Sequence, residues 1–427
     1  MNYYINYEGS KIYFSLPSEW NVISNQDISS GSGVSDVQQE VGRALNNPIG
    51  TPPLEELARP GMDVTLLFDD LQRPTPAHLA IPSILDRLNK AGIPDERINA
   101  VCALGTHPIP TLEQMEGKIG KETSRRLQGR ISSHDPHSPE NVVIGRTHRG
   151  TLVEVNKLVA FADLIIGIGE CMPHPNNGFG GGCKIVMPGV SSYRAVADHH
   201  FTWMRHRYAK VNLLDGNPFY EEIVDAGRLS RLAFKLDFIM NEKKEVIRAF
   251  AGDPVEEHRE ASKYAASLYL VTLPKRPDVT ITSASPLEIG VQATKALLMA
   301  SYCMRAGGTI IWVASQKQAG PILPLINEMA TPESANDYHR KLTKGDIPGH
   351  LKSFGISYIM QIVFYKELAE KFNVIHVTEG LSREQVEMMN FTYAGSLDEA
   401  INQTFKVMPK ADVAIFPSGG NIIPGVQ

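Results

Sequence analysis

Residues 173–200 concentrate the side chains of this chain that could do chemistry. The segment reads PHPNNGFGGGCKIVMPGVSSYRAVADHH, with His174 near its start, Lys184 directly after a run of glycines, and His199 and His200 at its end. Glycines let a backbone approach a bulky ligand closely. A lysine after them can supply a cation for phosphate or a nucleophilic amine. This combination favours a held cofactor over the alternative, a glycine-rich turn with solvated histidines.

Two further groups of polar residues follow apolar runs that are typical of buried strands. FDDLQRPTP places Asp70 and Arg73 between a predicted strand over 62–70 and a predicted helix. An arginine beside a helix N-terminus suits a phosphate, although an Asp70–Arg73 ion pair that stabilises a turn would have the same pattern. GTHPIPT places His107 at the end of the next predicted strand, where a single histidine is more often structural than catalytic.

The elements that would position these residues form two α/β series. The first runs from the strand over 62–70 through a helix over 78–93 to a strand over 98–107, which is the unit of a parallel sheet. The second follows a proline- and charge-rich stretch at 273–278, with strands over 278–285, 307–315 and 373–380 and helices over 287–305 and 356–372. The first 17 residues alternate and predict a hairpin.

We therefore predict an α/β protein of two doubly wound, Rossmann-like domains that face a cleft. The chain of 427 residues is too long for one ordinary core. The predicted boundaries are 1–272 for a cofactor-binding domain and 278–427 for a C-terminal domain, with the option that the last strand crosses back to the first domain. Functional residues are expected where the strands end.

Composition limits the class of protein. Hydrophobic residues make up 42% and charged residues 21%, which is typical of soluble globular proteins. A net charge of −5 without a basic stripe argues against a nucleic-acid partner. Four scattered cysteines without a CxxC pair indicate reduced thiols, and no apolar run reaches the roughly 18 residues of a membrane helix. We expect a cytoplasmic protein that does not engage a membrane.

In this order, the motifs resemble those of the LarA-type nickel-pincer lactate racemases and their 2-hydroxy-acid racemase and epimerase relatives. The resemblance covers nearly the full chain and includes GNP at 216–218, FAGD at 250–253 and EIGVQATKAL at 288–297. It implies an isomerase that inverts C2 of a small 2-hydroxy acid by reversible hydride transfer. The implied cofactor is a nickel pincer nucleotide, pyridinium-3-thioamide-5-thiocarboxylic acid mononucleotide, which dedicated biosynthetic proteins would supply.

The resemblance also implies roles for individual residues. Lys184 would carry the cofactor covalently, and His200 would bind nickel, while the adjacent His199 stands where relatives often have asparagine. The remaining implied roles are cofactor binding by Asp70, Arg73, Gly181 and Gly182, acid–base catalysis by His107 and His174, and substrate binding by Gln292, Lys295 and Tyr358.

A hydride-transfer mechanism would explain why two histidines are needed on opposite sides of the substrate. The hydrogen on C2 of a 2-hydroxy acid is barely acidic, because the neighbouring carboxylate stabilises a carbanion poorly. A base that removes the hydroxyl proton while C2 gives up hydride avoids that carbanion, and imidazole can serve as acid or base near neutrality. Lactate, a larger 2-hydroxy acid and a sugar acid all remain open as substrates, since Tyr358 replaces a tryptophan that covers the substrate in the lactate enzyme.

Three alternatives remain open at this point. A zinc hydrolase could use His134 and His137 together with histidines of the 173–200 segment. A dehydrogenase that uses free NAD is disfavoured, because no predicted strand is followed by GxGxxG with an acidic residue about 20 positions later. A non-catalytic nucleotide-binding homologue is disfavoured by the joint presence of Lys184, His200, His107 and His174.

Overall fold

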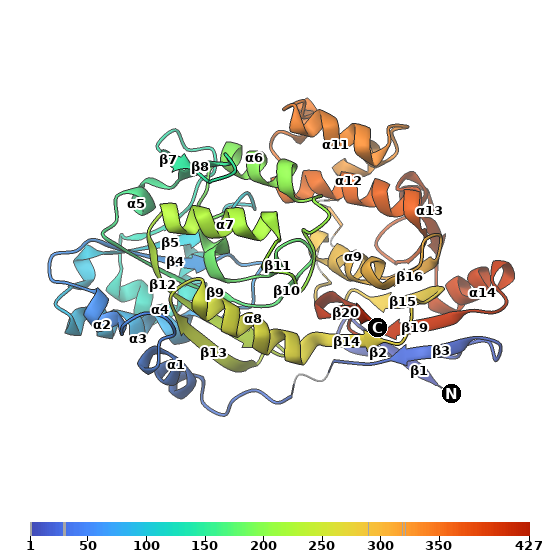
Figure 1. Ribbon diagram of the computed structural model, residues 1–427, viewed down its shortest axis with the longest axis horizontal. Coiled ribbons are helices and arrows are strands. Elements are labelled where there is room, and N and C mark those ends of the chain that lie inside the picture. Colours follow the sequence, from blue (N-terminus) through green and yellow to red (C-terminus); the bar gives the residue numbers. More distant parts are fainter. Residues whose placement is uncertain (1, 29–30, 289, 318, 321) are drawn as a thin grey trace. The chain divides into compact units, whose positions relative to one another are not determined.

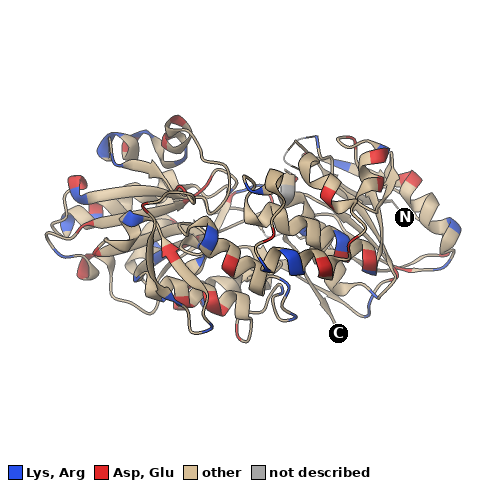
Figure 2. Ribbon diagram, turned by 90° about the horizontal axis from the view of Figure 1, so that it is seen from above, with Lys and Arg blue, Asp and Glu red and all other residues tan. Residues whose placement is uncertain are grey.

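The computed structural model describes residues 2–28, 31–288, 290–317, 319–320 and 322–427, and the chain divides into two compact units (Figure 1). The first unit comprises Ser30–Met172 and Asn176–Ala265. The second unit comprises Met1–Ser29, Pro173–Pro175 and Ala266–Gln427. Lysines and arginines are interspersed with acidic residues over both units (Figure 2). Within the described ranges, no helix is long and apolar enough to cross a membrane.

The first unit is built on a six-stranded sheet in which only the β12–β13 pair is antiparallel. Its strands, in spatial order, are β13 (Val246–Gly252), β12 (Leu232–Met240), β9 (Leu164–Glu170), β4 (Val64–Asp69), β5 (Ile98–Ala103) and β6 (Ile131–Ser133). Every residue of β4 and β9 is buried, as expected for central strands of a parallel sheet covered on both faces.

The two faces of this sheet have different coverings. Ile166 and Ile168 join the hydrophobic core that includes Ile81 and Ile84 of α3 (Ala77–Lys90). Gly167 lies between them and points the other way: a Cβ there would come 2.9 Å from Ile185. Because position 167 lacks a side chain, the glycine-rich segment can lie directly on this second face.

The other helices of the first unit are short to medium in length. They are α1 (Val37–Asn46), α2 (Leu54–Leu57), α4 (Leu112–Arg126), α5 (Lys157–Ala160), α6 (Tyr193–Trp203) and α7 (Pro218–Leu229). A small hairpin is formed by β7 (Val142–Arg146) and β8 (Leu152–Val155). Helix α8 (Glu256–Tyr269) runs from the first unit into the second.

The second unit has an all-parallel sheet. Its strands, in spatial order, are β18 (Thr392–Ala394), β17 (Asn373–Val377), β16 (Thr309–Val313), β15 (Val279–Ser283), β19 (Asp412–Phe416) and β3 (Asn21–Asn25). Its helices are α9 (Thr294–Cys303), α10 (Leu323–Met329), α11 (Ala335–Thr343), α12 (Ile356–Lys371), α13 (Arg383–Met388) and α14 (Leu397–Val407). The predicted N-terminal hairpin is present as β1 (Tyr3–Tyr7) and β2 (Ser10–Phe14).

The α/β class and the parallel architecture predicted from the sequence are confirmed, whereas the predicted boundary needs correction at the N-terminus. The prediction placed residues 1–272 in one domain, but β3 pairs with β19, so the N-terminal segment belongs to the second unit. The final strand β20 (Ile423–Val426) pairs with β14 (Leu270–Leu273), and both strands belong to the second unit.

Candidate active site

Lys184 follows a glycine loop that is held tightly against the sheet of the first unit. The lysine lies in η2 (Gly182–Ile185), and Gly181 and Gly182 adopt φ values of 86° and 54°. A Cβ at Gly181 would lie 2.5 Å from Oδ2 of Asp237, and one at Gly182 would lie 2.7 Å from Cγ of His258. Both the backbone conformation and the space therefore require glycine at these positions.

A buried polar network beneath the loop fixes its path. The amide of Gly182 donates to Oδ2 of Asp237 at 2.6 Å, and Nε2 of His258 donates to the carbonyl of Gly180 at 2.8 Å. Lys235 forms an ion pair with the same aspartate, and both side chains are fully buried. Burial opposes ionisation of Asp237, but the charges of Lys235 and His258 hold its pKa below the usual range.

Glu257 lies beside this network, where its ionised form is disfavoured. It is fully buried beside Asp237, and burial, followed by the charge of Asp237, raises its pKa well above the ordinary value. Lys235, Asp237, Glu257 and His258 are not among the residues predicted from the sequence. The alternation of charged and apolar residues in the KLDF stretch of β12 was the one available signal, because a buried strand rarely carries unpaired charges.

The amine of Lys184 is set up as a nucleophile. Burial, assisted by the positive charge of Arg73, lowers its pKa to about 7. Its Nζ atom lies 5.8 Å from the ring centroid of Phe219, which belongs to α7. A lysine with a pKa near neutrality has a substantial unprotonated fraction under physiological conditions, and only that form attacks an electrophile.

His199 and His200 lie on α6 and pack against the same phenylalanine. Their ring centroids lie 4.4 Å and 5.1 Å from that of Phe219, respectively. Burial lowers the pKa of His199 to about 3, and burial followed by the charges of His199 and Lys184 lowers that of His200 well below its usual range. Both imidazoles are therefore neutral, which is the form that binds a metal ion.

Asp70 and His107 form a pair at the ends of β4 and β5. Oδ2 of Asp70 lies 2.6 Å from Nδ1 of His107. Burial opposes ionisation of Asp70, but contact with His107 and the charges of Arg73 and Lys118 together lower its pKa. The side chain of Asp70 is therefore hydrogen-bonded to His107. The guanidinium of Arg73 lies 3.6 Å from the carboxylate of Glu170.

Lys118 of α4 braces the turn that carries Asp70 and Arg73. Its Nζ atom donates to the carbonyl of Arg73 at 2.6 Å and lies 3.1 Å from Oδ1 of Asp69. The sequence analysis did not single out this lysine, because it sits in an amphipathic helix with several other charged residues and nothing local distinguishes it.

The remaining predicted site residues belong to the second unit. Tyr302 of α9 donates its hydroxyl to the carbonyl of Pro175 at 2.8 Å, which fastens the segment containing His174 to that helix. Lys295 is buried in the first turn of α9, and Gln292 precedes it in η3 (Gly290–Ala293). Tyr358 is buried in the first turn of α12. His107 belongs to the first unit and His174 to the second, and the predicted acid–base roles of these two histidines remain a prediction.

Comparisons with known proteins identify the family. The model of the lactate racemase N-terminal domain matches residues 7–212, and that of the lactate racemase C-terminal domain matches residues 274–423. The chain belongs to the lactate racemase family. This is a family of isomerases.

Two curated relatives and one solved structure agree with this assignment. The chain is 27% identical over 438 residues to a lactate racemase of Thermoanaerobacterium thermosaccharolyticum, with 99% of each chain covered. It is 29% identical over 392 residues to a lactate racemase of Lactiplantibacillus plantarum, with 90% of each covered. The lactate racemase apoprotein structure from the former organism superposes with a TM-score of 0.87 at 26% identity, covering 99% of this chain and 100% of that one.

For this lactate racemase family member, the histidines proposed for a zinc hydrolase have structural contacts. Nε2 of His134 donates to the carbonyl of Ser191 at 2.9 Å, and the ring of His137 stacks on Tyr193. Burial lowers the pKa of His134 to about 4, so its ring is neutral and serves as a buried hydrogen-bonding group. These contacts weigh against the zinc alternative.

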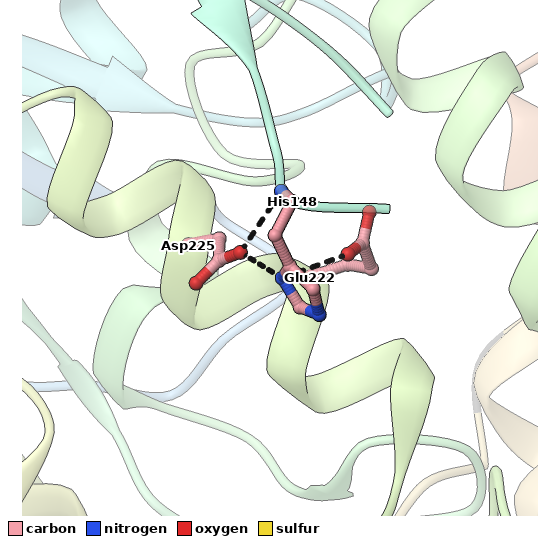
Figure 3. A group of neighbouring side chains, drawn as sticks. All are labelled: His148, Glu222 and Asp225. Atoms are coloured by element: carbon pink, nitrogen blue, oxygen red, sulfur yellow. Dashed lines mark hydrogen bonds and ion pairs between the residues drawn. The ribbon is translucent and has the colours of Figure 1, made fainter. Parts of the chain in front are cut away.

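A different group, His148, Glu222 and Asp225, has the spacing that a metal ion would need (Figure 3). Its members are already paired: His148 bonds to Asp225 through both its ring and its backbone amide, and Arg149 lies 3.7 Å from Oε1 of Glu222. The hydroxyl of Thr147 bonds to the other oxygen of Glu222. We interpret this group as an ion-pair cluster that fastens the β7–β8 hairpin to α7.

Proposed function

We propose that this chain is a racemase or epimerase that inverts C2 of a small 2-hydroxy acid, with a nickel pincer nucleotide attached to Lys184 and nickel bound by His200. The observation that carries the proposal is the pair of functional groups around Phe219. A buried amine with a pKa of about 7 and a buried neutral imidazole both pack on this ring.

The residues of the first unit fit such a cofactor. A lysine must be unprotonated to be acylated, and an imidazole must be neutral to ligate nickel; burial favours both states here. Arg73 would supply positive charge for a nucleotide phosphate, and the side-chain-free backbone at Gly181 and Gly182 leaves the loop open to a bulky group. When bound, the cofactor would supply a carbon that accepts and returns hydride.

His107 is suited to take the proton of the substrate hydroxyl. The carboxylate of Asp70 can only accept, so Nδ1 of His107 carries the proton in their 2.6 Å contact, and Nε2 is left as the basic nitrogen. An ionised carboxylate also stabilises the imidazolium that forms when Nε2 gains a proton. On the other side of the substrate, His174 would perform the same task for the opposite enantiomer.

Residues of the second unit would hold the substrate carboxylate. Lys295 lies in the first turn of α9, where its charge adds to the positive end of the helix dipole. Gln292 would add an amide donor, and Tyr358 would limit the size of the substrate side chain. Because Tyr302 ties the segment of His174 to the same helix, the carboxylate anchor and one acid–base histidine share a rigid support.

The proposal can be tested with protein co-expressed with the cofactor-building proteins. We expect an intact mass that exceeds the chain by the cofactor, bound nickel, and loss of optical purity with D-lactate or another 2-hydroxy acid. Substrate deuterated at C2 should keep its label in the inverted product, because reversible hydride transfer would not exchange this hydrogen with water. Washout of deuterium into solvent would instead indicate two-base proton transfer.

The matched control is Lys184→Ala prepared in the same host. It should lack the mass increment and nickel. If this variant keeps both, Lys184 is not the attachment site.

A further inference from the structure

We infer that His199 is a positioning residue that fixes the ring tautomer of His200, so that Nε2 of His200 carries the lone pair available to a metal ion. The tautomer assignment follows from hydrogen bonding within α6 and α7. Its consequence for nickel rests on the proposed function.

His199 forms a hydrogen bond with the backbone of α7. Its Nε2 atom lies 3.0 Å from the carbonyl oxygen of Phe219. A carbonyl can only accept a hydrogen bond, so Nε2 of His199 must carry a proton. A neutral imidazole has a single N–H group, and Nδ1 of His199 is therefore an acceptor.

The contact between the two histidine rings then fixes the position of the proton in His200. The Nδ1 atoms of His199 and His200 are 3.1 Å apart, which is hydrogen-bond distance. Since Nδ1 of His199 can only accept, Nδ1 of His200 must donate. The carbonyl of Val196, one turn earlier in α6, is a further acceptor for the ring of His200. The contact with His199 leaves Nε2 of His200 without a proton.

The burial of His199 and His200 argues against an imidazolium form of either ring. Both rings are buried, and burial strongly disfavours an imidazolium at either position. The neutral pair has one consistent arrangement of its two protons. The chain of contacts from Phe219 through His199 to His200 therefore determines which nitrogen of His200 carries the proton.

Fixing the tautomer of a metal-binding histidine also fixes its ring orientation. Hydrogen bonds to the second nitrogen of a ligating histidine typically change metal affinity by about 10- to 100-fold. A purely structural role for His199, as filler against Phe219, predicts no such effect. Phenylalanine has a ring of similar shape without nitrogens. A positioning role predicts that His199→Phe weakens nickel binding, whereas a filler role predicts no change.

The tautomers can be observed directly in the apoprotein. With 15N-histidine labelling, long-range proton–nitrogen correlation spectra distinguish ring nitrogens that carry a proton from those that do not. We expect protons on Nε2 of His199 and on Nδ1 of His200, with signals assigned through His199→Phe and His200→Phe. A proton on Nε2 of His200, or on both of its nitrogens, would overturn the inference, and this measurement requires neither metal nor cofactor.

Nickel retention provides the second arm. In cofactor-loaded protein, His199→Phe should release nickel to a chelator about 10- to 100-fold faster and shift the visible absorption band. His199→Asn, whose amide can both donate and accept, should stay close to the parent. His206→Phe, a histidine beyond the end of α6 that contacts Trp203 and Tyr208, is the matched control. Parent-like nickel retention by a folded His199→Phe would overturn the inference.

The two arms separate this inference from the proposed function. If the parent protein takes up no nickel while the spectra show the expected tautomers, the proposed function fails and the hydrogen-bond assignment stands. If nickel binds but Nε2 of His200 carries a proton in the apoprotein, the positioning role of His199 fails alone.

Discussion

Oδ2 of Asp70 lies 2.6 Å from Nδ1 of His107, so the carboxylate that follows β4 orients the imidazole that follows β5. The two strands are neighbours in the sheet, with Asp69 in register with Ala103. Their carboxyl ends therefore bring together two residues that are 37 positions apart in sequence. Contact with His107 and the positive charges of Arg73 and Lys118 lower the pKa of the carboxyl in spite of its burial.

Replacing this carboxylate tests whether Asp70 acts through His107. We expect Asp70→Asn to lower racemisation turnover by about 100- to 1000-fold, because the substitution removes the charge that stabilises the imidazolium. The cofactor mass and nickel content should be unchanged. Loss of the cofactor with normal turnover per loaded molecule would instead assign Asp70 to nucleotide binding, the role that the family resemblance implies.

The reactivity of Lys184 should depend on pH near neutrality. Its pKa is lowered to about 7, so the unprotonated fraction rises as the pH increases through that value. In apoprotein labelled competitively with trace acetic anhydride, the extent of acetylation at Lys184 should show a midpoint near pH 7, while ordinary lysines titrate near 10.4. Peptide mass spectrometry reports both from one digest.

Arg73→Gln is the matched variant for this measurement. The charge of Arg73 is one of the two causes that lower the pKa of Lys184, so its removal should move the labelling midpoint to higher pH. A midpoint that stays in place would show that burial alone sets the reactivity of the amine.

The buried acid below the glycine loop should affect stability in a pH-dependent way. The folded pKa of Glu257 is raised, so its contribution to stability is fully present below the unfolded value near 4.5 and is lost as the pH rises toward the folded pKa. Glu257→Gln keeps a neutral donor beside Asp237. Its melting temperature relative to the parent should therefore be higher at pH 8 than at pH 4.5. An equal difference at both values would mean that Glu257 is not held neutral.

Much of the fold could be predicted because its signals are local. The buried strand over 62–70 and the helix over 356–372 correspond closely to β4 (Val64–Asp69) and α12 (Ile356–Lys371). Each has a continuous apolar run or a clear boundary. The position of β3 was not predictable, because NVISN has no strong pattern and its partner, β19, lies almost 400 residues away. Only the long-range pairing reveals that the N-terminus belongs to the second unit.

The candidate site shows the same division between local and long-range information. The glycine loop, Lys184 and His200 stand out as a motif within one segment. Lys235 and Asp237 do not, since their role depends on burial of a strand against a loop some 55 residues earlier. The hydrogen-bond chain through His199 was likewise beyond sequence reasoning, which could separate His199 from His200 only by spacing.

The last prediction concerns His107 and His174 as opposed acid–base groups. Each histidine should remove the hydroxyl proton from only one enantiomer and, by microscopic reversibility, should return a proton when that same enantiomer is formed. Because the equilibrium constant between enantiomers is one, a single substitution must lower kcat/KM equally in both directions, by about 100-fold or more. Cofactor and nickel should remain bound in His107→Gln and His174→Gln.

A single-turnover experiment distinguishes this pair from two histidines with one shared task. Loaded protein in excess over one pure enantiomer is quenched with acid, and the released 2-keto acid is measured. The parent should yield keto acid from both enantiomers, whereas His107→Gln should yield it from one and His174→Gln from the other, because the remaining base reaches only one hydroxyl. Loss of the same enantiomer in both variants would show that the two histidines do not flank the substrate.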